Sequence, residues 1–225
     1  MSLKGILLVN KSLGTTSFQI VSLLRRLTNE RTIGHGGTLD PLASGVMILF
    51  IGREFTRRAN DFLGLDKQYK ATLTLGITTD TYDAEGQVTS RSQETPSLQQ
   101  IETVLKGFQG EIQQVPPMFS AKKVGGKKLY DLARRGITIE RAPVKVRVNI
   151  QSFHYTYPHL ELLVDCSKGT YIRSLACDIG QTLGCGAHLS SLTRLKIGSF
   201  TLDECIPQEA LKNKEFDITP HLRTL

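Results

Sequence analysis

The feature that most constrains the fold is a mixture of two hydrophobic periods along one chain, with no regular order of strand and helix. Some segments are apolar throughout or at every second residue, which is typical of strands, and others carry apolar residues three and four apart, which is typical of helices. The pattern predicts strands at residues 5–9, 46–51, 69–75, 144–150 and 160–164, and helices at 16–27, 98–108, 127–135 and 170–183. Because no βαβ order repeats, we expect an α+β fold around a mixed, largely antiparallel central sheet flanked by helices.

The apolar segments are too short to cross a membrane. The longest unbroken one is Val46–Ile51, whereas a spanning helix needs roughly 20 residues, and the N-terminal residues Met1–Gly5 lack a signal-peptide pattern. These observations predict a cytoplasmic protein. The cysteines form no Cys-x-x-Cys pair, so we expect reduced thiols and no structural zinc; they are Cys166, Cys177, Cys185 and Cys205.

The positive charge is concentrated in one segment. The net charge is +7, and residues 121–147 carry nine basic side chains against two acidic ones, so the rest of the chain is formally neutral. The basic residues are Lys122, Lys123, Lys127, Lys128, Arg134, Arg135, Arg141, Lys145 and Arg147. A polyanion that docks at one place, such as a nucleic acid, explains this better than a solvated charged face does.

A glycine-rich loop is the first candidate for chemistry. It runs from Gly34 to Pro41 and contains Asp40. Its glycines allow close approach of the backbone to a ligand, and Pro41 favours an extended conformation for the residue before it, so the loop can hold a carboxylate rigidly. The alternative is a turn in which Asp40 caps a backbone amide. The loop matches neither phosphate-binding glycine motif.

Two further residues stand out by their placement. Arg173 lies in the first turn of a predicted helix, where the helix dipole disfavours a cation, so a carboxylate such as Asp40 or a bound phosphate would compensate it. A surface arginine is equally compatible with the pattern. Tyr69 opens an alternating strand and suits either the core or a ring that stacks on a base.

Weaker patterns favour structural roles. The acidic stretch with Asp80, Asp83 and Glu85 misses the calcium-loop spacing and is interpreted as a turn after a strand. Cys185 and His188 are at most half of a metal site.

Several motifs together resemble one known family. They are Gly34–Gly45 followed by an apolar strand and Gly52, Lys67–Ala71 leading to Leu75–Thr81, Gln114–Lys122, Lys168–Leu175 and Cys185–Leu189. In this order they are similar to the TruB family of tRNA pseudouridine-55 synthases, over about residues 4–200.

The resemblance implies a pseudouridine synthase fold and a reaction without cofactor or metal, in which a uridine of the tRNA T-loop is detached at N1, turned, and rejoined to its ribose through C5. It assigns the nucleophile to Asp40, the carboxylate partner to Arg173 and the ring stacked on the base to Tyr69. His35, Tyr171 and Leu192 fall where the family contacts the flipped nucleotide. The basic segment at about 115–147 resembles a thumb that grips the T-arm, with Lys122, Lys127, Lys128, Arg134 and Arg135 as its contacts.

The chain departs from the family pattern at a few positions. Ser12 stands where a proline is usual, Phe119 where tyrosine is commoner, and Thr193 where arginine is usual. Only 25 residues follow Phe200, so we expect a single catalytic domain over 1–225, without the RNA-binding PUA domain, acting as a monomer. The alternatives are a tRNA-binding or tRNA-folding protein without chemistry, and a guide-RNA-dependent synthase.

Overall fold

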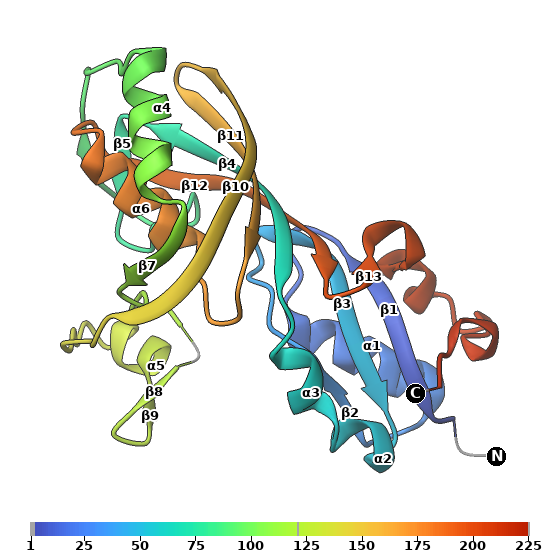
Figure 1. Cartoon of the computed structure of the whole chain (residues 1–225). Coiled ribbons are helices and arrows are strands. Elements are labelled where there is room, and N and C mark those ends of the chain that lie inside the picture. Colours follow the sequence, from blue (N-terminus) through green and yellow to red (C-terminus); the bar gives the residue numbers. More distant parts are fainter. Residues whose placement is uncertain (1–2, 121, 225) are drawn as a thin grey trace. The chain divides into compact units, whose positions relative to one another are not determined.

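The computed structural model describes residues 3–120 and 122–224, so Met1 and Ser2 of the N-terminal pattern and Ala121 of the basic segment lie outside the described residues. The chain divides into two compact units (Figure 1), the first formed by residues up to Lys70 and from Leu192 onward, the second by Ala71–Ser191. The single catalytic domain stays a prediction. No helix in the described ranges is long and apolar enough to cross a membrane.

The first unit is built on a strand pair that is apolar on both faces. Strand β1 (Gly5–Lys11) pairs antiparallel with β3 (Ala43–Ile51) from Gly5↔Ile51 to Lys11↔Gly45. Two short strands flank the pair: β2 (Ile33–His35) pairs antiparallel with β3, and β14 (Ile206–Pro207) pairs parallel with β1. The longer strand β12 (Ala187–Ile197) pairs parallel with β3 and antiparallel with β13 (Phe200–Thr201).

Helices cover both faces of this pair, which explains why residues 46–51 are apolar without alternation. On one face, helix α1 (Ser17–Thr28) packs Ile20 and Leu24 against Met47 and its neighbours. It begins with a capping box, in which the Thr16 side chain accepts from the Gln19 amide. On the other face lie α2 (Arg53–Thr56) and α3 (Ala59–Leu63).

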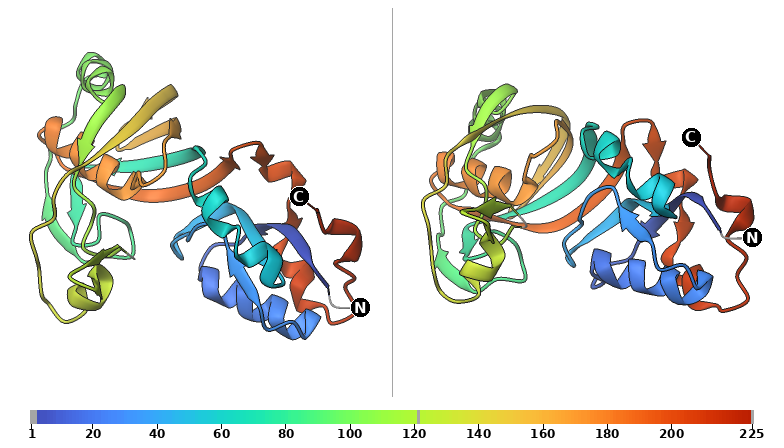
Figure 2. Two further views of the ribbon diagram at one scale, coloured as in Figure 1. Left: turned by 60° about the horizontal axis from the view of Figure 1, so that its bottom comes forward. Right: turned by 90° about the horizontal axis from the view of Figure 1, so that it is seen from below.

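The C-terminal segment completes the first unit. Three 3₁₀ turns, η1 (Leu202–Glu204), η2 (Gln208–Lys212) and η3 (Thr219–His221), lead back to the N-terminal strand (Figure 2). Arg223 and Ile6 exchange two backbone hydrogen bonds of 2.9 Å. Leu211 and Ile218 are buried in the α1 core, so the tail has a packing role that the sequence did not predict.

In the second unit, strands follow the hydrogen-bonded order β12-β4-β11-β10-β7. They are β4 (Lys67–Leu75), β7 (Gly110–Gln114), β10 (Val144–Thr156) and β11 (His159–Cys166), and β10 is antiparallel to both of its neighbours. Helices α4 (Leu98–Gly107) and α6 (Ile172–Thr182) contact each other. The α+β class and the largely antiparallel sheet predicted from the sequence are confirmed.

Two hairpins decorate the second unit. Strands β5 (Ile77–Thr79) and β6 (Val88–Arg91) form one hairpin. Strands β8 (Lys123–Val124) and β9 (Lys127–Lys128) form the other, and helix α5 (Leu129–Ala133) follows it directly. Gly136 follows this helix with φ 70°, a left-handed conformation that is common just after a helix ends.

Candidate active site

The loop that carries Asp40 is fixed to helix α1 at several backbone groups. The Ser17 hydroxyl donates to the Leu39 carbonyl oxygen (3.1 Å) and accepts from the Leu39 N–H (2.9 Å). The Gly14 N–H donates to the Pro41 carbonyl (2.9 Å), and the Ala43 N–H donates to the Asp40 carbonyl (3.0 Å). Asp40 itself is half-buried. The loop therefore holds its carboxylate on a rigid support, as its glycine and proline pattern predicted.

A buried arginine supports the same loop from the other side. Arg194 on β12 is only 2% exposed. Its guanidinium donates from Nε to the Val46 carbonyl (2.8 Å), from Nη1 to Thr38 (3.4 Å) and from Nη2 to Gly37 (3.2 Å). These carbonyls lie before and after Asp40 in the chain. Arg194 thus ties both ends of the loop together, a role that the sequence analysis missed.

His35 lies at the end of β2, opposite Leu49 of β3. Its Nδ1 accepts a hydrogen bond from the Gly37 N–H (3.3 Å). Burial, and to a smaller extent the charge of Arg194, lower the pKa of His35 below its usual value. The imidazole is therefore neutral at pH 7, and Nδ1 has a lone pair for the Gly37 amide.

The remaining predicted residues of the first unit lie on β12 and β4. Leu192 pairs with Ala43, three residues after Asp40. The Gly198 N–H donates to the Asp66 carbonyl (2.8 Å) and the Ser190 hydroxyl to Thr72 (3.0 Å), so β12 and β4 run antiparallel. This register places Tyr69, which is 8% exposed, beside residues 193–195. Tyr69 and Leu192 thus lie on neighbouring strands of the unit that also carries Asp40 and His35.

Arg173 lies in the first turn of α6, as predicted, and is 6% exposed. Its Nε lies 3.6 Å from a carboxylate oxygen of Asp83. Its terminal nitrogens donate to the Thr81 carbonyl (3.2 Å) and the Phe119 carbonyl (2.7 Å). Asp83 is therefore one anion that offsets the unfavourable position of this cation, although the sequence analysis assigned it only to a turn.

Asp83 is held as firmly as the arginine that it pairs with. Its Oδ1 accepts from the Thr81 hydroxyl (2.6 Å) and from the Glu85 N–H (3.1 Å), and Asp83 is 4% exposed. The adjacent Tyr82 has φ 65°, a left-handed conformation that is costly for a bulky residue. This strained turn aims Asp83 at Arg173.

The motif at 114–120 binds the start of α6. The fully buried amide of Gln114 accepts from the Tyr171 N–H (2.7 Å) and donates to the Tyr171 carbonyl (3.1 Å). The Ser174 hydroxyl donates to the Val115 carbonyl (3.0 Å). Tyr171, the N-cap residue of α6, is thus fixed through its backbone, and its side chain is half-buried; its contact with a nucleotide stays a prediction.

The basic residues of the predicted thumb lie on the hairpin and helix between β7 and β10. Lys127, Arg134 and Arg135 are exposed. Lys128 lies 5.3 Å from the centre of the Tyr130 ring, and the Arg134 guanidinium lies 5.5 Å from it. Lys122 is half-buried and its carbonyl accepts from the Leu129 N–H (2.9 Å). All five predicted contacts therefore lie on one small element, in which Tyr130 orders two of the cations.

The predicted residues fall into three groups, one in the first unit and two in the second. Asp40 belongs to the first unit and Arg173 to the second, and the pairing of their side chains stays a prediction. No cluster of metal-ligating side chains occurs in residues 3–120 and 122–224.

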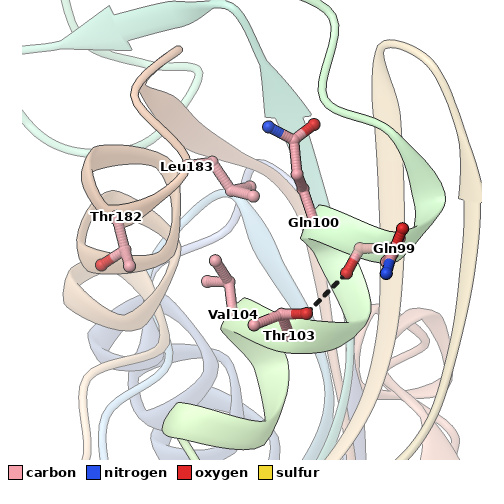
Figure 3. Close-up of a pocket in the computed structure, with 6 residues that line it drawn as sticks. All are labelled: Gln99, Gln100, Thr103, Val104, Thr182 and Leu183. Atoms are coloured by element: carbon pink, nitrogen blue, oxygen red, sulfur yellow. Dashed lines mark hydrogen bonds between the residues drawn. The ribbon is translucent and has the colours of Figure 1, made fainter.

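Two cavities lie away from all predicted site residues. One of about 290 Å³ lies between α4 and α6 (Figure 3) and is lined by Gln99, Gln100, Thr103, Val104, Thr182 and Leu183. The other, of about 390 Å³, is lined by Leu23, Arg26, Leu27, Leu211, Lys212 and Lys214. Neither contributes to the arrangement around Asp40 or around Arg173.

Known proteins are similar to this chain in sequence. Two family models match: TruB family pseudouridylate synthase (N terminal domain) at residues 25–172, and tRNA pseudouridylate synthase B C-terminal domain at 173–222. A tRNA pseudouridine synthase B from Chlamydia trachomatis serovar L2 is 53% identical over 222 residues, 99% of this chain and 92% of that protein. One from Protochlamydia amoebophila is 55% identical over 204 residues, 91% of this chain and 78% of that protein.

Solved structures are similar as well. A chain in the crystal structure of a Cbf5-Nop10-Gar1 complex has a TM-score of 0.72 and 29% identity, covering 92% of this chain and 53% of that one. A chain in the structure of an H/ACA RNP bound to a substrate RNA containing 2′-deoxyuridine has a TM-score of 0.67 and 27% identity, covering 92% and 51%. This chain spans about half the length of both. The family model covers residues 25–172, and relatives are similar to this chain along nearly its whole length. This chain therefore belongs to the TruB family of pseudouridylate synthases.

Proposed function

We propose that this enzyme converts uridine 55 in the T-loop of tRNA to pseudouridine, with Asp40 as the nucleophile. The observation that supports this most directly is the Asp40 loop, whose backbone is hydrogen-bonded to α1 and to Arg194 on both sides of the carboxylate. A carboxylate held in this way is suited to attack a reacting atom, because little further conformational entropy is lost when it adopts the reactive position. The names of the relatives support tRNA as the substrate.

The reaction needs a carboxylate and a pocket for a base, and no electron transfer. The bond between N1 and ribose C1′ breaks, the uracil turns, a bond forms between C1′ and C5, and the C5 proton is lost while N1 gains one. Ionised Asp40 attacks C1′ or the uracil ring, or assists cleavage electrostatically. In this proposal Arg173 keeps the carboxylate ionised. Tyr69 stacks on the flipped base, and His35, Tyr171 and Leu192 contact the nucleotide.

The basic hairpin and α5 provide the grip on the T-arm. Lys122, Lys127, Lys128, Arg134 and Arg135 bind its phosphates, since cations on one element suit a backbone that carries a charge at every nucleotide. The enzyme acts on tRNA as a monomer, in the cytoplasm, and needs no guide RNA.

The test is incubation of the purified protein with an unmodified tRNA transcript, followed by mapping of pseudouridine. We expect product at position 55 alone. Asp40→Asn should abolish product while the Kd for tRNA stays within about twofold, because the isosteric amide cannot act as the nucleophile. Asp61→Asn is the matched control, since Asp61 is an exposed aspartate of the same unit that pairs with Arg58.

Each other outcome has a defined meaning. Undiminished turnover by Asp40→Asn would reject the nucleophile. Product at another uridine would reject the T-loop assignment but leave the isomerase. Tight binding of tRNA without any product would favour the tRNA-folding alternative, and a requirement for an added RNA would favour a guide-dependent enzyme.

A further inference from the structure

Arg194 is the largest side chain in the fully buried part of the protein. Among residues 3–120 and 122–224 no carboxylate pairs with its guanidinium, and its hydrogen bonds go to the carbonyls of Gly37, Thr38 and Val46. A buried cation without a counter-anion is costly to fold. A methionine or leucine would fill the same space without that cost, so packing alone does not explain an arginine here.

The geometry of the three hydrogen bonds explains the choice of residue. Nε bonds to Val46 in strand β3, whereas the two terminal nitrogens bond to consecutive carbonyls of Gly37 and Thr38. Only a planar guanidinium presents three donors on separate nitrogens in one rigid plane. The fork therefore fixes the distance between the start of the Asp40 loop and the strand that follows the loop.

Both backbone polar groups of Gly37, its N–H and its carbonyl, are hydrogen-bonded to side chains. Arg194 binds its carbonyl, and the His35 Nδ1 accepts from its N–H (3.3 Å). Gly37 has φ 133°, a conformation that glycine adopts readily and L side chains rarely do. The charge of Arg194 also opposes protonation of His35, and a protonated Nδ1 could not accept from the amide.

The approach of β12 to β3 is equally tight at the other end of the loop. A side chain at Gly45, which has φ 110°, would collide with the backbone of Arg194. The Ser44 and Thr193 hydroxyls are 3.0 Å apart at the same place. Arg194 is thus in direct backbone and side-chain contact with both ends of the segment that carries Asp40.

We propose that Arg194 is a positioning residue for the reaction, which holds the Asp40 loop in its working conformation through the carbonyls of Gly37, Thr38 and Val46. It touches neither the substrate nor the reacting atoms. This inference rests on the proposed function of Asp40. If Arg194 positions the loop, loss of its three hydrogen bonds should slow the chemical step. The affinity for tRNA should be retained, because Arg194 does not bind the tRNA.

The decisive variant is Arg194→Lys, which keeps the buried charge but supplies one nitrogen in place of three. We expect single-turnover conversion at position 55 to fall by about tenfold or more, since a misplacement on the order of 1 Å can cost about a hundredfold. The Kd for tRNA should stay within about twofold. The Gly37 amide should lose protection from hydrogen exchange. Arg223→Lys is the matched control, because Arg223 pairs with Glu204 in the same unit.

A second variant separates the charge from the fork. In Arg194→Gln the charge is lost, so the His35 pKa, followed by NMR of its ring protons, should rise towards that of a free histidine, whereas in Arg194→Lys it should stay low. Circular dichroism shows whether each variant is folded, and the His35 pKa and the turnover are measured at a temperature below the unfolding midpoint of every variant. Only folded proteins are then compared. If Arg194→Gln does not fold, the lysine variant alone decides the question.

The outcomes distinguish this inference from the proposed function. Arg194→Lys with turnover within twofold of the wild type and unchanged Gly37 protection overturns the inference while leaving the function intact. If the wild-type enzyme forms no product at position 55, the proposed function fails, and the exchange of the Gly37 amide still decides whether Arg194 positions the loop. Equal losses of turnover and of tRNA affinity would also contradict a positioning role.

Discussion

At the scale of single residues, two buried arginines are satisfied largely by backbone carbonyls around them. Arg173 is bound by Asp83 and by the carbonyls of Thr81 and Phe119, and Arg194 by three carbonyls. The unusual position of Arg173 could be predicted from the sequence because the helix dipole depends only on local order. The partner Asp83 could not, since 90 residues separate the two along the chain.

Asp178, on the same helix as Arg173, should make the stability of the protein depend on pH. Burial raises the pKa of Asp178 on α6 to about 6. Because the folded state holds this proton more tightly than the unfolded state, the contribution of Asp178 to the unfolding free energy is lost as pH rises from about 4 to about 6. Asp178→Asn replaces the carboxyl group with a neutral amide, so no charge is buried at this position at any pH. We expect the variant to unfold at a higher temperature than the wild type at pH 7.5, and at the same temperature at pH 4.

Thermal unfolding followed by circular dichroism across this pH range measures the effect. Glu102→Gln provides the control, because Glu102 is an exposed acid on the neighbouring helix α4. A constant difference between Asp178→Asn and the wild type at every pH would rule out titration of Asp178 as the cause.

At the scale of elements, local signals predicted what local forces determine. The predicted helices at 16–27, 98–108 and 170–183 correspond to α1, α4 and α6 within a few residues at each end. Strand β12 was missed because His188 and Arg194 occupy buried positions, which hides its alternation. Helices α2 and α3 are too short to show a period. The segments that sequence reasoning missed are therefore those shaped by long-range packing.

The basic hairpin and α5 should act as one electrostatic element. If it neutralises about five phosphates, the logarithm of tRNA affinity should fall with the logarithm of salt concentration with a slope of about −3.5 to −4.5. Lys127→Glu with Arg135→Glu alters two exposed cations of this element and leaves Lys128 and Arg134, the two that lie over the Tyr130 ring, unchanged. We expect weaker binding and a slope flatter by about 1.5.

Fluorescence titration of labelled tRNA at several salt concentrations measures this slope. The matched control is Arg91→Glu with Lys106→Glu, which reverses two exposed cations on β6 and α4 of the same unit. A slope that changes equally in both double variants would mean that net charge, rather than this element, determines the affinity.

At the scale of the whole molecule, each unit has a core that excludes water from its thiols. Cys205 belongs to the first unit and the other three cysteines to the second, and within residues 3–120 and 122–224 none of the four forms a disulfide. That these thiols are reduced stays a prediction. Burial raises the pKa of Cys177 to about 11 and that of Cys205 to about 12. The thiolate is the reactive form, so at pH 8 only about one thiol in a thousand at Cys177 is ionised in the folded protein.

Thiol alkylation should consequently report global unfolding. We expect the folded enzyme to react slowly with iodoacetamide at pH 8, and all four thiols to react within minutes in concentrated denaturant, as counted by intact mass. The thiol introduced by Glu102→Cys on the exposed face of α4 shows how fast an accessible cysteine reacts under the same conditions. Native cysteines that react as fast as this reference would contradict the burial of the two cores, because thiolate character and access both set the rate.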